Sequence, residues 1–565
     1  MIDPKKPAEL LFKNAKVVDV FSNKIIETSL AVQNGKIMGF GDYESDEIID
    51  LEGAYICPSF IDSHVHIESS MVSPAQFTKT IAAGGVTSIV ADPHEIANVS
   101  GLDGIEYILN ATENIPSDVY VMLPSCVPAT QFETSGAVLT ADKLEKLIDH
   151  DRVLGLGELM DFYGVIERRE DIAEKLKIAE GKIIDGHGPV IEGKELDAYI
   201  SAGVRTEHEC TTVEEMNDRI SRGMYVLIRQ GSAAKNLPEL IKGVNKDNLR
   251  RILFCTDDRH PEDLIKDGNV DNNVRMAVEY GIDPIDAIKI ASLNAAEAYG
   301  LEKKGAIAPG YRADMIVFRD LKDIRAEKVY KDGKLIAENG KILAEYEEYH
   351  DDRVMSKVNI RKIEKDDLKV EFSKKDRAEA NIIEIVKNDL ITKRHVEELK
   401  LSDGLYDFGN EDIVKIAVIE RHTGKSTVFT GLLKGYGIKN GAAGTTIAHD
   451  SHNIIVAGDN DEDMLNVISK IDEMKGGIAV SSGGKILESL QLDISGLMTT
   501  ENIEFVNKRL KKMMKTARRL GVSEGVDPFM NLSFLALPVI PDIKITDKGL
   551  FDVRNFEFIS IEIEK

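Results

Sequence analysis

The segment Asp62-Ser63-His64-Val65-His66 could do metal chemistry, because it places two histidines two residues apart at the end of an apolar run. In a β-strand, side chains at positions i and i+2 point to the same face, so both imidazoles can approach one cation. A His-x-His pair also occurs by chance, and does not establish a site alone. The other apolar runs decide whether more ligands converge with it.

Further histidines and carboxylates follow other apolar runs of the same region. These segments are Gly155-Leu156-Gly157-Glu158, Asp185-Gly186-His187-Gly188, Glu207-His208-Glu209 and Cys255-Thr256-Asp257-Asp258. Imidazole and carboxylate are the ligand set for Zn, Fe and Mn. Four of the twelve histidines would therefore lie at one rim if these runs were successive strands. We infer a site for two cations, which a single Glu could bridge.

The elements that must position these residues read as short apolar runs alternating with helix-like segments, which is typical of parallel βα units. The candidate strands are Tyr55 to Asp62, Thr87 to Ala91, Val119 to Leu123, Val153 to Gly157, Ile183 to Asp185, Arg205 to Glu207, Tyr225 to Ile228 and Ile252 to Cys255. Eight units over ~250 residues match a TIM barrel, whose chemistry lies at the C-terminal ends of the strands. A doubly wound open sheet is the competing fold, but no Gly-x-Gly-x-x-Gly motif follows a first strand.

Both flanks of this region read as short strands and turns. Residues 10–56 contain the hairpin signal Asn34-Gly35, and a similar signature runs from Gly310 to the turn Asn339-Gly340. One β-domain built from both flanks is expected, with two unrelated hairpin regions as the alternative. The predicted fold class is α/β, a TIM-like (β/α)8 barrel with two additions. The expected domains are a composite β-sandwich of residues 1–57 and 306–350, the barrel of residues 58–305, a charged connector of residues 351–377 and a C-terminal α/β domain of residues 378–565.

Composition argues against several partners and sites. The 565 residues carry 97 Asp and Glu against 71 Lys and Arg, a net charge of −26 at pH 7, so nucleic acid and anionic membranes are poor partners. No apolar run reaches the ~20 residues of a membrane span, and the first residues lack a secretory core, so a cytoplasmic protein is expected. The four cysteines form no Cys-x-x-Cys pair, which argues against thiolate zinc sites and cysteine-ligated nucleobase deaminases.

The stretch from Pro58 to Ser70, PSFIDSHVHIESS, strongly resembles the amidohydrolase superfamily. Its continuation Ile67-Glu68-Ser69-Ser70 resembles the adenine deaminases within that superfamily. Further similar blocks are Ala91-Asp92-Pro93-His94-Glu95-Ile96-Ala97-Asn98, Leu156-Gly157-Glu158-Leu159-Met160-Asp161, Asp185-Gly186-His187-Gly188-Pro189, Thr256-Asp257-Asp258-Arg259-His260-Pro261, Ala448-His449-Asp450-Ser451-His452-Asn453 and Asp527-Pro528-Phe529-Met530. The resemblance covers nearly the whole chain.

The resemblance implies hydrolytic deamination of adenine to hypoxanthine and ammonia in purine salvage. It also implies two divalent metal ions, Mn or Fe with Zn as the alternative. The implied ligands are His64, His66, Glu158, His187, His208 and Asp257. Glu158 takes the bridging role that a carboxylated lysine has in other members, and Asp258 stays open as the alternative to Asp257. A hydroxide shared by two cations would attack C6 of adenine, while Asp257 relays a proton to the departing amine.

Adenine also needs hydrogen-bond groups at its edge to be distinguished from other bases. The candidates for this binding are Glu68, Ser69, Asp92, His94, Glu95, Asp161, His449 and His452. His94 could instead bind a further cation or be a plain loop histidine, and the two C-terminal histidines could form a lid or be turn residues. Glu207 and Glu209 flank His208 and are expected to point to the opposite face, in structural pairs.

Two other functions are weighed against deamination. A cyclic amide hydrolase of the dihydroorotase or hydantoinase type would keep the barrel and the metals, but such enzymes usually carry a modified lysine where this chain has Glu158. A metal-free barrel acting as an assembly scaffold should have lost ligands, whereas this sequence keeps a full set. The family resemblance further implies a homodimer or higher homo-oligomer.

Overall fold

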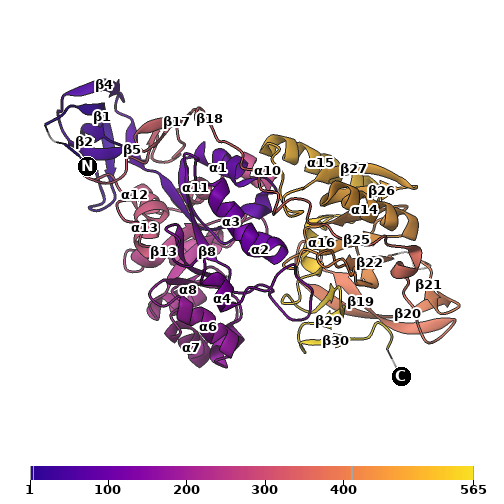
Figure 1. Ribbon diagram of the computed structural model, residues 1–565. Coiled ribbons are helices and arrows are strands. Elements are labelled where there is room, and N and C mark those ends of the chain that lie inside the picture. Colours follow the sequence, from indigo (N-terminus) through magenta and orange to yellow (C-terminus); the bar gives the residue numbers. More distant parts are fainter. Residues whose placement is uncertain (1, 4, 409–411, 564–565) are drawn as a thin grey trace. The chain divides into compact units, whose positions relative to one another are not determined.

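The structure is a computed structural model that describes residues 2–3, 5–408 and 412–563. The chain forms two compact units. Figure 1 shows the chain coloured by residue number. Unit 1 comprises Met1–Pro93, Ile108–Ser125 and Thr140–His350, and unit 2 comprises His94–Tyr107, Cys126–Leu139 and Asp351–Lys565.

One sheet of unit 1 combines strands from both flanks of the barrel. Its strands follow the order β18-β17-β16-β15-β5-β1-β2-β3, and β4 pairs with β1. The bounds are β1 (Ala8–Asp19), β2 (Lys24–Gln33), β3 (Lys36–Phe40), β4 (Ser45–Asp50), β5 (Tyr55–Pro58), β15 (Met315–Phe318), β16 (Lys328–Lys331), β17 (Lys334–Glu338) and β18 (Lys341–Ile342). Because β5 pairs antiparallel with β15, the two flanks are not unrelated hairpins. Buried residues such as Phe12 and Tyr330, whose rings meet edge to face at 5.0 Å, form its core.

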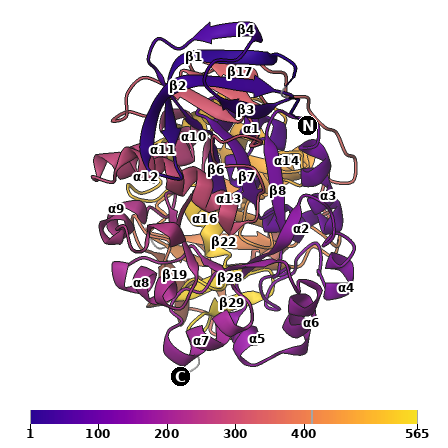
Figure 2. The same cartoon turned by 90° about the vertical axis from the view of Figure 1, so that its left-hand side faces the viewer.

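The barrel of unit 1 is built from parallel strands that run in sequence order. The bounds are β6 (Phe60–His66), β7 (Val86–Ala91), β8 (Asp118–Leu123), β9 (Val153–Leu159), β10 (Ile183–Gly186), β11 (Thr206–Glu207), β12 (Tyr225–Arg229), β13 (Ile252–Cys255) and β14 (Asp257–Asp258). Hydrogen bonds link β10-β9-β8-β7-β6-β14 and β11-β12-β13. The short strand β14 follows β13 after Thr256 and pairs with β6, which brings the last strand of the barrel back to the first. Figure 2 shows β6, β7 and β8 side by side.

The predicted first strand, Tyr55 to Asp62, is wrong as a single element. The structure divides it at Ser59, so that β5 belongs to the flank sheet and β6 to the barrel. The apolar run is continuous across the division because both parts are buried. Hydrophobicity alone therefore does not reveal where the chain changes sheets.

Helices alternate with the barrel strands, and several have clear start signals. Ser73 caps α1 by accepting the N–H of Gln76, with Pro74 in the first turn, and Thr212 and Glu215 form a capping box at α8. The helices of the barrel region are α1 (Pro74–Ala82), α4 (Ala141–Leu144), α5 (Phe162–Ile166), α6 (Glu170–Ile178), α7 (Gly193–Ser201), α8 (Val213–Ser221), α9 (Leu237–Leu240), α10 (Pro261–Lys266), α11 (Val270–Glu279), α12 (Pro284–Lys289) and α13 (Ala295–Ala298). The helix α3 (Leu102–Ala111) belongs to unit 2 up to Tyr107 and to unit 1 from Ile108.

Unit 2 is centred on a mixed, mostly antiparallel sheet in the order β21-β20-β19-β23-β22-β25-β24-β26-β27. The bounds are β19 (Arg377–Ile385), β20 (Thr392–Ser402), β21 (Leu405–Tyr406), β22 (Ile413–Ile419), β23 (Val428–Lys434), β24 (Ala442–Thr445), β25 (Ile454–Gly458), β26 (Gly477–Ser482) and β27 (Lys485–Gln491), with a smaller sheet of β28 (Ile543–Thr546), β29 (Gly549–Asp552) and β30 (Glu557–Ile559). The helices α14 (Asp461–Met474) and α15 (Ile503–Arg519) pack beside β26 and β27 (Figure 1). Helix α14 buries Met464, Val467 and Ile471 at helical spacing against this sheet.

Two segments that lie between barrel strands in the sequence fold with unit 2. They are His94–Tyr107, which begins with α2 (His94–Ser100), and Cys126–Leu139. The Thr134 N–H donates to Asp547 Oδ1 at 2.9 Å, and Asn453 Nδ2 donates to the Thr134 carbonyl at 2.9 Å. The sequence-based division placed both segments within the 58–305 barrel, because their partners lie more than 300 residues away in the chain.

No helix within residues 2–3, 5–408 and 412–563 combines the length and the apolar character that crossing a membrane would require. The cysteines Cys57, Cys126, Cys210 and Cys255 are all buried free thiols. Burial raises the pKa of the Cys57 thiol, which keeps it protonated and unreactive.

Candidate metal centre

Glu158 is the residue around which the predicted ligands of unit 1 gather. It lies in β9, and its Oε1 is 2.9 Å from His64 Nε2 and 2.9 Å from His66 Nε2, both on β6. Asp257 Oδ1, from β14, is 3.0 Å from His66 Nε2 and 3.6 Å from His64 Nε2. These four side chains form one group that could hold a cation.

The other carboxylate oxygen of Glu158 faces a second pair of histidines. Oε2 is 2.9 Å from His187 Nδ1, which follows β10, and 3.9 Å from His208 Nε2, which follows β11. Glu158, His187 and His208 form a second group able to hold a cation. The two groups share only Glu158, through different oxygens, which is the arrangement of a carboxylate that bridges two cations.

The donor atoms fit bound cations better than they fit one another. His64 Nε2, Glu158 Oε1, His187 Nδ1 and His208 Nε2 are buried, yet none makes a hydrogen bond of acceptable geometry within the described part of the chain. Buried polar atoms normally find such partners. Nitrogen and oxygen lone pairs that converge without hydrogen bonds are the chemistry of a divalent cation site.

Hydrogen bonds from groups outside the cluster hold the predicted ligands in place. His66 Nδ1 lies 2.9 Å from the Asp92 carbonyl, to which it donates when its Nε2 lone pair faces the site. Asp92 Oδ2 in turn accepts the N–H of Glu158 at 2.8 Å. Asp62 accepts the N–H of Thr256 at 3.1 Å and the Asn269 amide at 2.9 Å, which ties β6 to the turn before Asp257.

Two charged residues at this centre were not predicted as site residues. Arg229, the last residue of β12, donates from Nη1 to Asp257 Oδ2 at 2.7 Å and from Nη2 to Glu209 Oε2 at 3.0 Å. Glu209 differs from the expectation of a carboxylate on the opposite face, because its Oε1 lies 3.5 Å from His208 Nε2 and 3.7 Å from His187 Nδ1. The available signal for Arg229 was its position directly after an apolar run, as for the other rim residues.

The electrostatics favour ionised carboxylates at the centre. Burial raises the pKa of Glu158, but its contacts with the imidazoles of His187, His64 and His66 outweigh burial and hold this pKa well below its usual range. For Asp257, burial is likewise outweighed, mainly by the Arg229 guanidinium, and the pKa is well below its usual range. Burial together with His64 lowers the pKa of His208 to about 3, which leaves a neutral ring with a lone pair.

The remaining candidates of unit 1 have different surroundings. The structure brings Asp257 into the cluster, whereas Asp258 Oδ1 accepts a hydrogen bond from Ser69 Oγ. Glu68 is buried in the turn after β6. Asp161 caps α5 by accepting the Gly164 N–H at 2.8 Å, and it also pairs with Arg169.

Three other candidates meet within unit 2. Glu95, on α2, lies between His449 and His452: its Oε1 is 2.6 Å from His449 Nδ1, and its Oε2 contacts His452 Nε2. Burial raises the pKa of Glu95, but the neighbouring imidazoles, His449 foremost, lower it well below its usual range. His94 Nε2 lies 3.5 Å from Glu95 Oε1.

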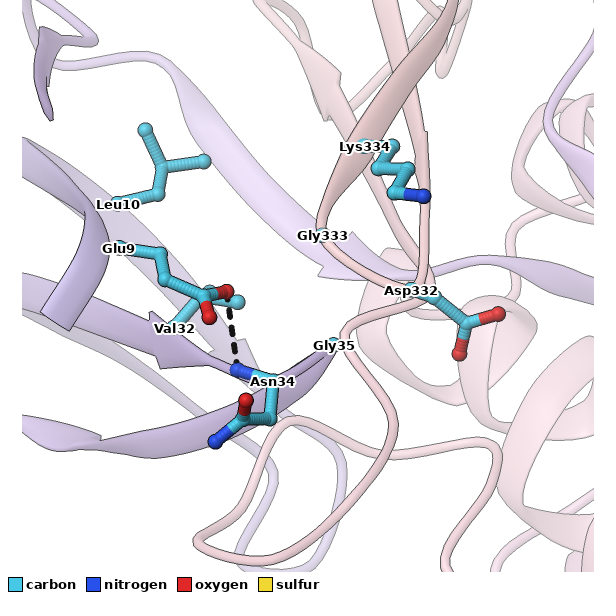
Figure 3. A pocket seen from close by; sticks show the side chains of 8 residues that line it. All are labelled: Glu9, Leu10, Val32, Asn34, Gly35, Asp332, Gly333 and Lys334. Atoms are coloured by element: carbon cyan, nitrogen blue, oxygen red, sulfur yellow. Dashed lines mark hydrogen bonds between the residues drawn. The ribbon is translucent and has the colours of Figure 1, made fainter. Parts of the chain in front are cut away.

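A separate cavity of about 410 Å³ lies in the flank sheet of unit 1. Figure 3 shows its lining at the β2–β3 turn and the β16–β17 turn, where Glu9 Oε2 accepts the Asn34 N–H at 2.9 Å. Its lining residues are Glu9, Leu10, Val32, Asn34, Gly35, Asp332, Gly333 and Lys334. No predicted site residue is among them, and the cavity holds neither histidine nor cysteine in its described lining.

The sequence matches known families over both units. A model of the amidohydrolase family matches residues 55–336, and a model of the adenine deaminase C-terminal domain matches residues 389–557. The chain is 51% identical over 559 residues to an adenine deaminase of Clostridium acetobutylicum, with 98% of each chain covered. It is 48% identical over 560 residues to adenine deaminase 2 of Carboxydothermus hydrogenoformans, covering 99% of this chain and 98% of that one.

A third relative is also similar to this chain over nearly its full length. The chain is 45% identical over 563 residues to an adenine deaminase of Nitratidesulfovibrio vulgaris, covering 99% of this chain and 97% of the relative. These matches span the barrel, its flank sheet and the C-terminal sheet of unit 2, and they agree with the parallel barrel that carries the His and Glu cluster. The chain therefore belongs to the adenine deaminase family of the amidohydrolases.

Proposed function

We propose that this chain catalyses the hydrolytic deamination of adenine to hypoxanthine and ammonia at a binuclear metal centre in unit 1. The proposed ligands are His64, His66, Glu158, His187, His208 and Asp257. The proposal rests mainly on the two carboxylate oxygens of Glu158, since Oε1 faces one pair of histidines and Oε2 faces another. Curated relatives named adenine deaminase over nearly the full chain support adenine as the substrate.

The metals supply chemistry that no side chain of this centre offers. Two divalent cations, when bound, act as Lewis acids and provide a nucleophile from water at neutral pH. Mn or Fe is our first choice and Zn the alternative, since a set of nitrogen and oxygen ligands admits all three. The N–H of Glu158 donates to Asp92 Oδ2, which holds the backbone of Glu158 in place in β9.

Asp257 is the proposed proton carrier. Its Oδ2 is held by Arg229, which leaves Oδ1 directed at the histidine cluster. In the reaction, oxygen from water adds to C6 of adenine and the exocyclic nitrogen leaves as ammonia. Oδ1 of Asp257 accepts the proton of the attacking water and returns it to the departing nitrogen, which must be protonated to leave.

Substrate recognition needs polar groups beside this centre. We assign it first to Glu68 and Ser69, because both follow β6 directly after the ligand His66. Ser69 is held in place by its bond to Asp258. We further infer a cytoplasmic enzyme that acts as a homodimer or higher homo-oligomer.

The test is metal content combined with a panel of substrates. The full chain, purified with Mn present, should hold two metal ions in unit 1 and release ammonia from adenine but not from guanine or adenosine. It should not open the ring of a cyclic amide, which is followed separately because that hydrolysis releases no ammonia. Removal of the metals by a chelator should abolish the release, and Mn should restore it. Absence of ammonia from adenine in fully metallated, folded protein would overturn the proposal, and turnover of a cyclic amide would favour the dihydroorotase or hydantoinase reaction.

A further inference from the structure

We propose that Glu95, His449 and His452 of unit 2 form a third site for a divalent cation, distinct from the two cation groups of unit 1. The nearest ligand atoms of these three residues all lie within 4.8 Å of one another. Two imidazoles and one carboxylate are the protein ligands of many Zn sites and of non-haem Fe(II) sites. The site draws on no residue of the unit 1 cation groups.

The ligand atoms are buried in a manner that suits a bound ion. The exposed fractions of the side chains are 4% for Glu95, 1% for His452 and 12% for His449. A buried carboxylate is costly unless it is compensated by hydrogen bonds or by a positive charge. A divalent cation would supply that charge.

Each ligand is fixed by contacts inside unit 2. The α2 helix that carries Glu95 is anchored through Asn98, whose carbonyl accepts from Ser135 Oγ at 2.7 Å and from the Gly136 N–H at 2.7 Å. The His449 N–H donates to the Ser533 carbonyl at 3.2 Å, and its ring packs on Phe534 at 4.6 Å. Such support limits the rearrangement that ligands must undergo on binding.

His452 has the most constrained position of the three. Its φ is 54°, in the left-handed region that few residues other than glycine adopt, and its carbonyl accepts a hydrogen bond from the buried Arg421. Its Nδ1 accepts the Ala448 N–H at 3.2 Å, so without a cation the ring carries its proton on Nε2, facing Glu95. A cation would replace that proton on Nε2.

Two further side chains could complete the coordination. His94 and Asp450 form with Glu95 another group whose ligand atoms lie within 4.8 Å of one another. Zn, Fe and Mn commonly take more than three ligands, so a fourth from this side or a water is expected. One alternative is that these residues bind no metal and that Glu95 accepts hydrogen bonds from both histidines. Another alternative is that the three residues bind the substrate.

Metal counting on the full chain separates these alternatives. The protein is stripped with a chelator and titrated with Mn²⁺, and bound metal is measured by elemental analysis after gel filtration. We expect three equivalents in the wild type and two in Glu95→Gln and His449→Gln. His395→Gln is the matched control in unit 2, because this partly exposed histidine lies outside the cluster, and it should retain three.

The proposal would be overturned if the wild type and His449→Gln bound the same number of Mn²⁺ ions. An unchanged metal count with a raised KM for adenine would assign these residues to substrate binding. Thermal melting identifies a variant that fails to fold, and a Mn anomalous difference map of the wild type then decides, with a peak required within about 2.3 Å of His449 Nδ1. Failure of the unit 1 proposal is distinguishable, because Glu158→Gln would then leave the metal count unchanged.

Discussion

The Arg229 guanidinium holds Asp257 by one carboxylate oxygen and leaves the other to the metal ligands. Nη1 of Arg229 is 2.7 Å from Asp257 Oδ2, while Asp257 Oδ1 is 3.0 Å from His66 Nε2. The second contact of Arg229, with Glu209, keeps the guanidinium in place. Asp257 itself has a φ of 57°, so its backbone lies in the left-handed region and not in an ordinary strand conformation.

Replacement of Arg229 should therefore lower turnover without unfolding the barrel. We expect Arg229→Met to lose about 10- to 100-fold in kcat or in metal affinity, the usual effect of removing a group that orients a metal ligand. Arg229→Lys should recover part of the loss, because lysine keeps the charge but not the fork that spans two carboxylates. Arg222→Met serves as the control, because this arginine directly follows α8 and pairs with Asp197 and Asp218. A kcat and a metal content of Arg229→Met within twofold of the wild type would show that Arg229 does not position Asp257 for catalysis or metal binding.

Because the two carboxylate oxygens of Glu158 belong to different cation groups, we expect that one cation can be lost without the other. His187→Ala should leave about one unit 1 metal, held by His64, His66, Asp257 and Glu158, and should lower adenine turnover at least about 100-fold, since a two-metal mechanism loses one of its cations. Elemental analysis and ammonia release measure the two effects. His150→Ala is the control, because this exposed histidine of unit 1 lies outside the cluster. Loss of both metals in His187→Ala would show that the groups fill as one.

Lys544 in unit 2 predicts a specific dependence of stability on pH. Burial lowers its pKa to about 7, although Asp389 and Asp542 oppose the effect, and its Nζ donates to the Leu390 carbonyl at 3.0 Å. The unfolded state has the ordinary, higher lysine pKa, so between pH 7 and about 10 it binds more protons than the folded state. The penalty for burying the charge is therefore complete below pH 7 and disappears as the pH rises.

Lys544→Met should remove this dependence. The stability of the variant relative to the wild type should be highest near pH 7 and should fall by up to a few kcal/mol by pH 9.5, at about 1.4 kcal/mol for each unit of pKa shift. Thermal melting of both proteins at the two pH values measures the difference, and Lys515→Met, at an exposed position of α15, is the control. A difference independent of pH would mean that Lys544 is not titrating in this range.

Unit 2 combines residues 351–565 with two earlier segments, so removal of residues 351–565 should destabilise the chain that remains. Removal of residues 351–565 leaves the segments 94–107 and 126–139 without their partners, among them Phe551 and Phe558, whose rings lie 4.7 Å and 5.7 Å from Phe132. Exposed apolar surface of this kind promotes aggregation. We expect the truncated chain to aggregate in gel filtration and to lack a cooperative melt, whereas a monodisperse, sharply melting product would contradict this dependence.

The barrel and the choice of ligand types could be predicted from the sequence, because both follow from local rules. Apolar runs of strand length alternate with helical segments, and the polar residues that end each run must meet at one rim. The pair His64 and His66 follows from the two-residue repeat of a strand, and both side chains face Glu158 in the structure. The metal-ligand roles of these residues stay predictions until metal is measured.

The remaining features depend on contacts between residues far apart in the chain, which no local pattern records. Arg229 meets Asp257 28 residues later, and a single arginine after an apolar run also fits an ordinary surface position. Glu95 meets His449 and His452 more than 350 residues away. The split of the first predicted strand at Ser59 was hidden because both parts are buried and apolar.

Glu158→Gln is the decisive variant for the proposal that Glu158 bridges two catalytic metals in an adenine-deaminating centre. Glutamine keeps the size of the side chain but offers a single acceptor oxygen and no charge. Metal content and ammonia release from adenine should be measured together on the wild type, Glu158→Gln and the exposed control Glu167→Gln. We predict that Glu158→Gln loses the metals of unit 1 and adenine turnover together, while Glu167→Gln keeps both. Full metal content with normal ammonia release in folded Glu158→Gln would exclude a bridging role for Glu158.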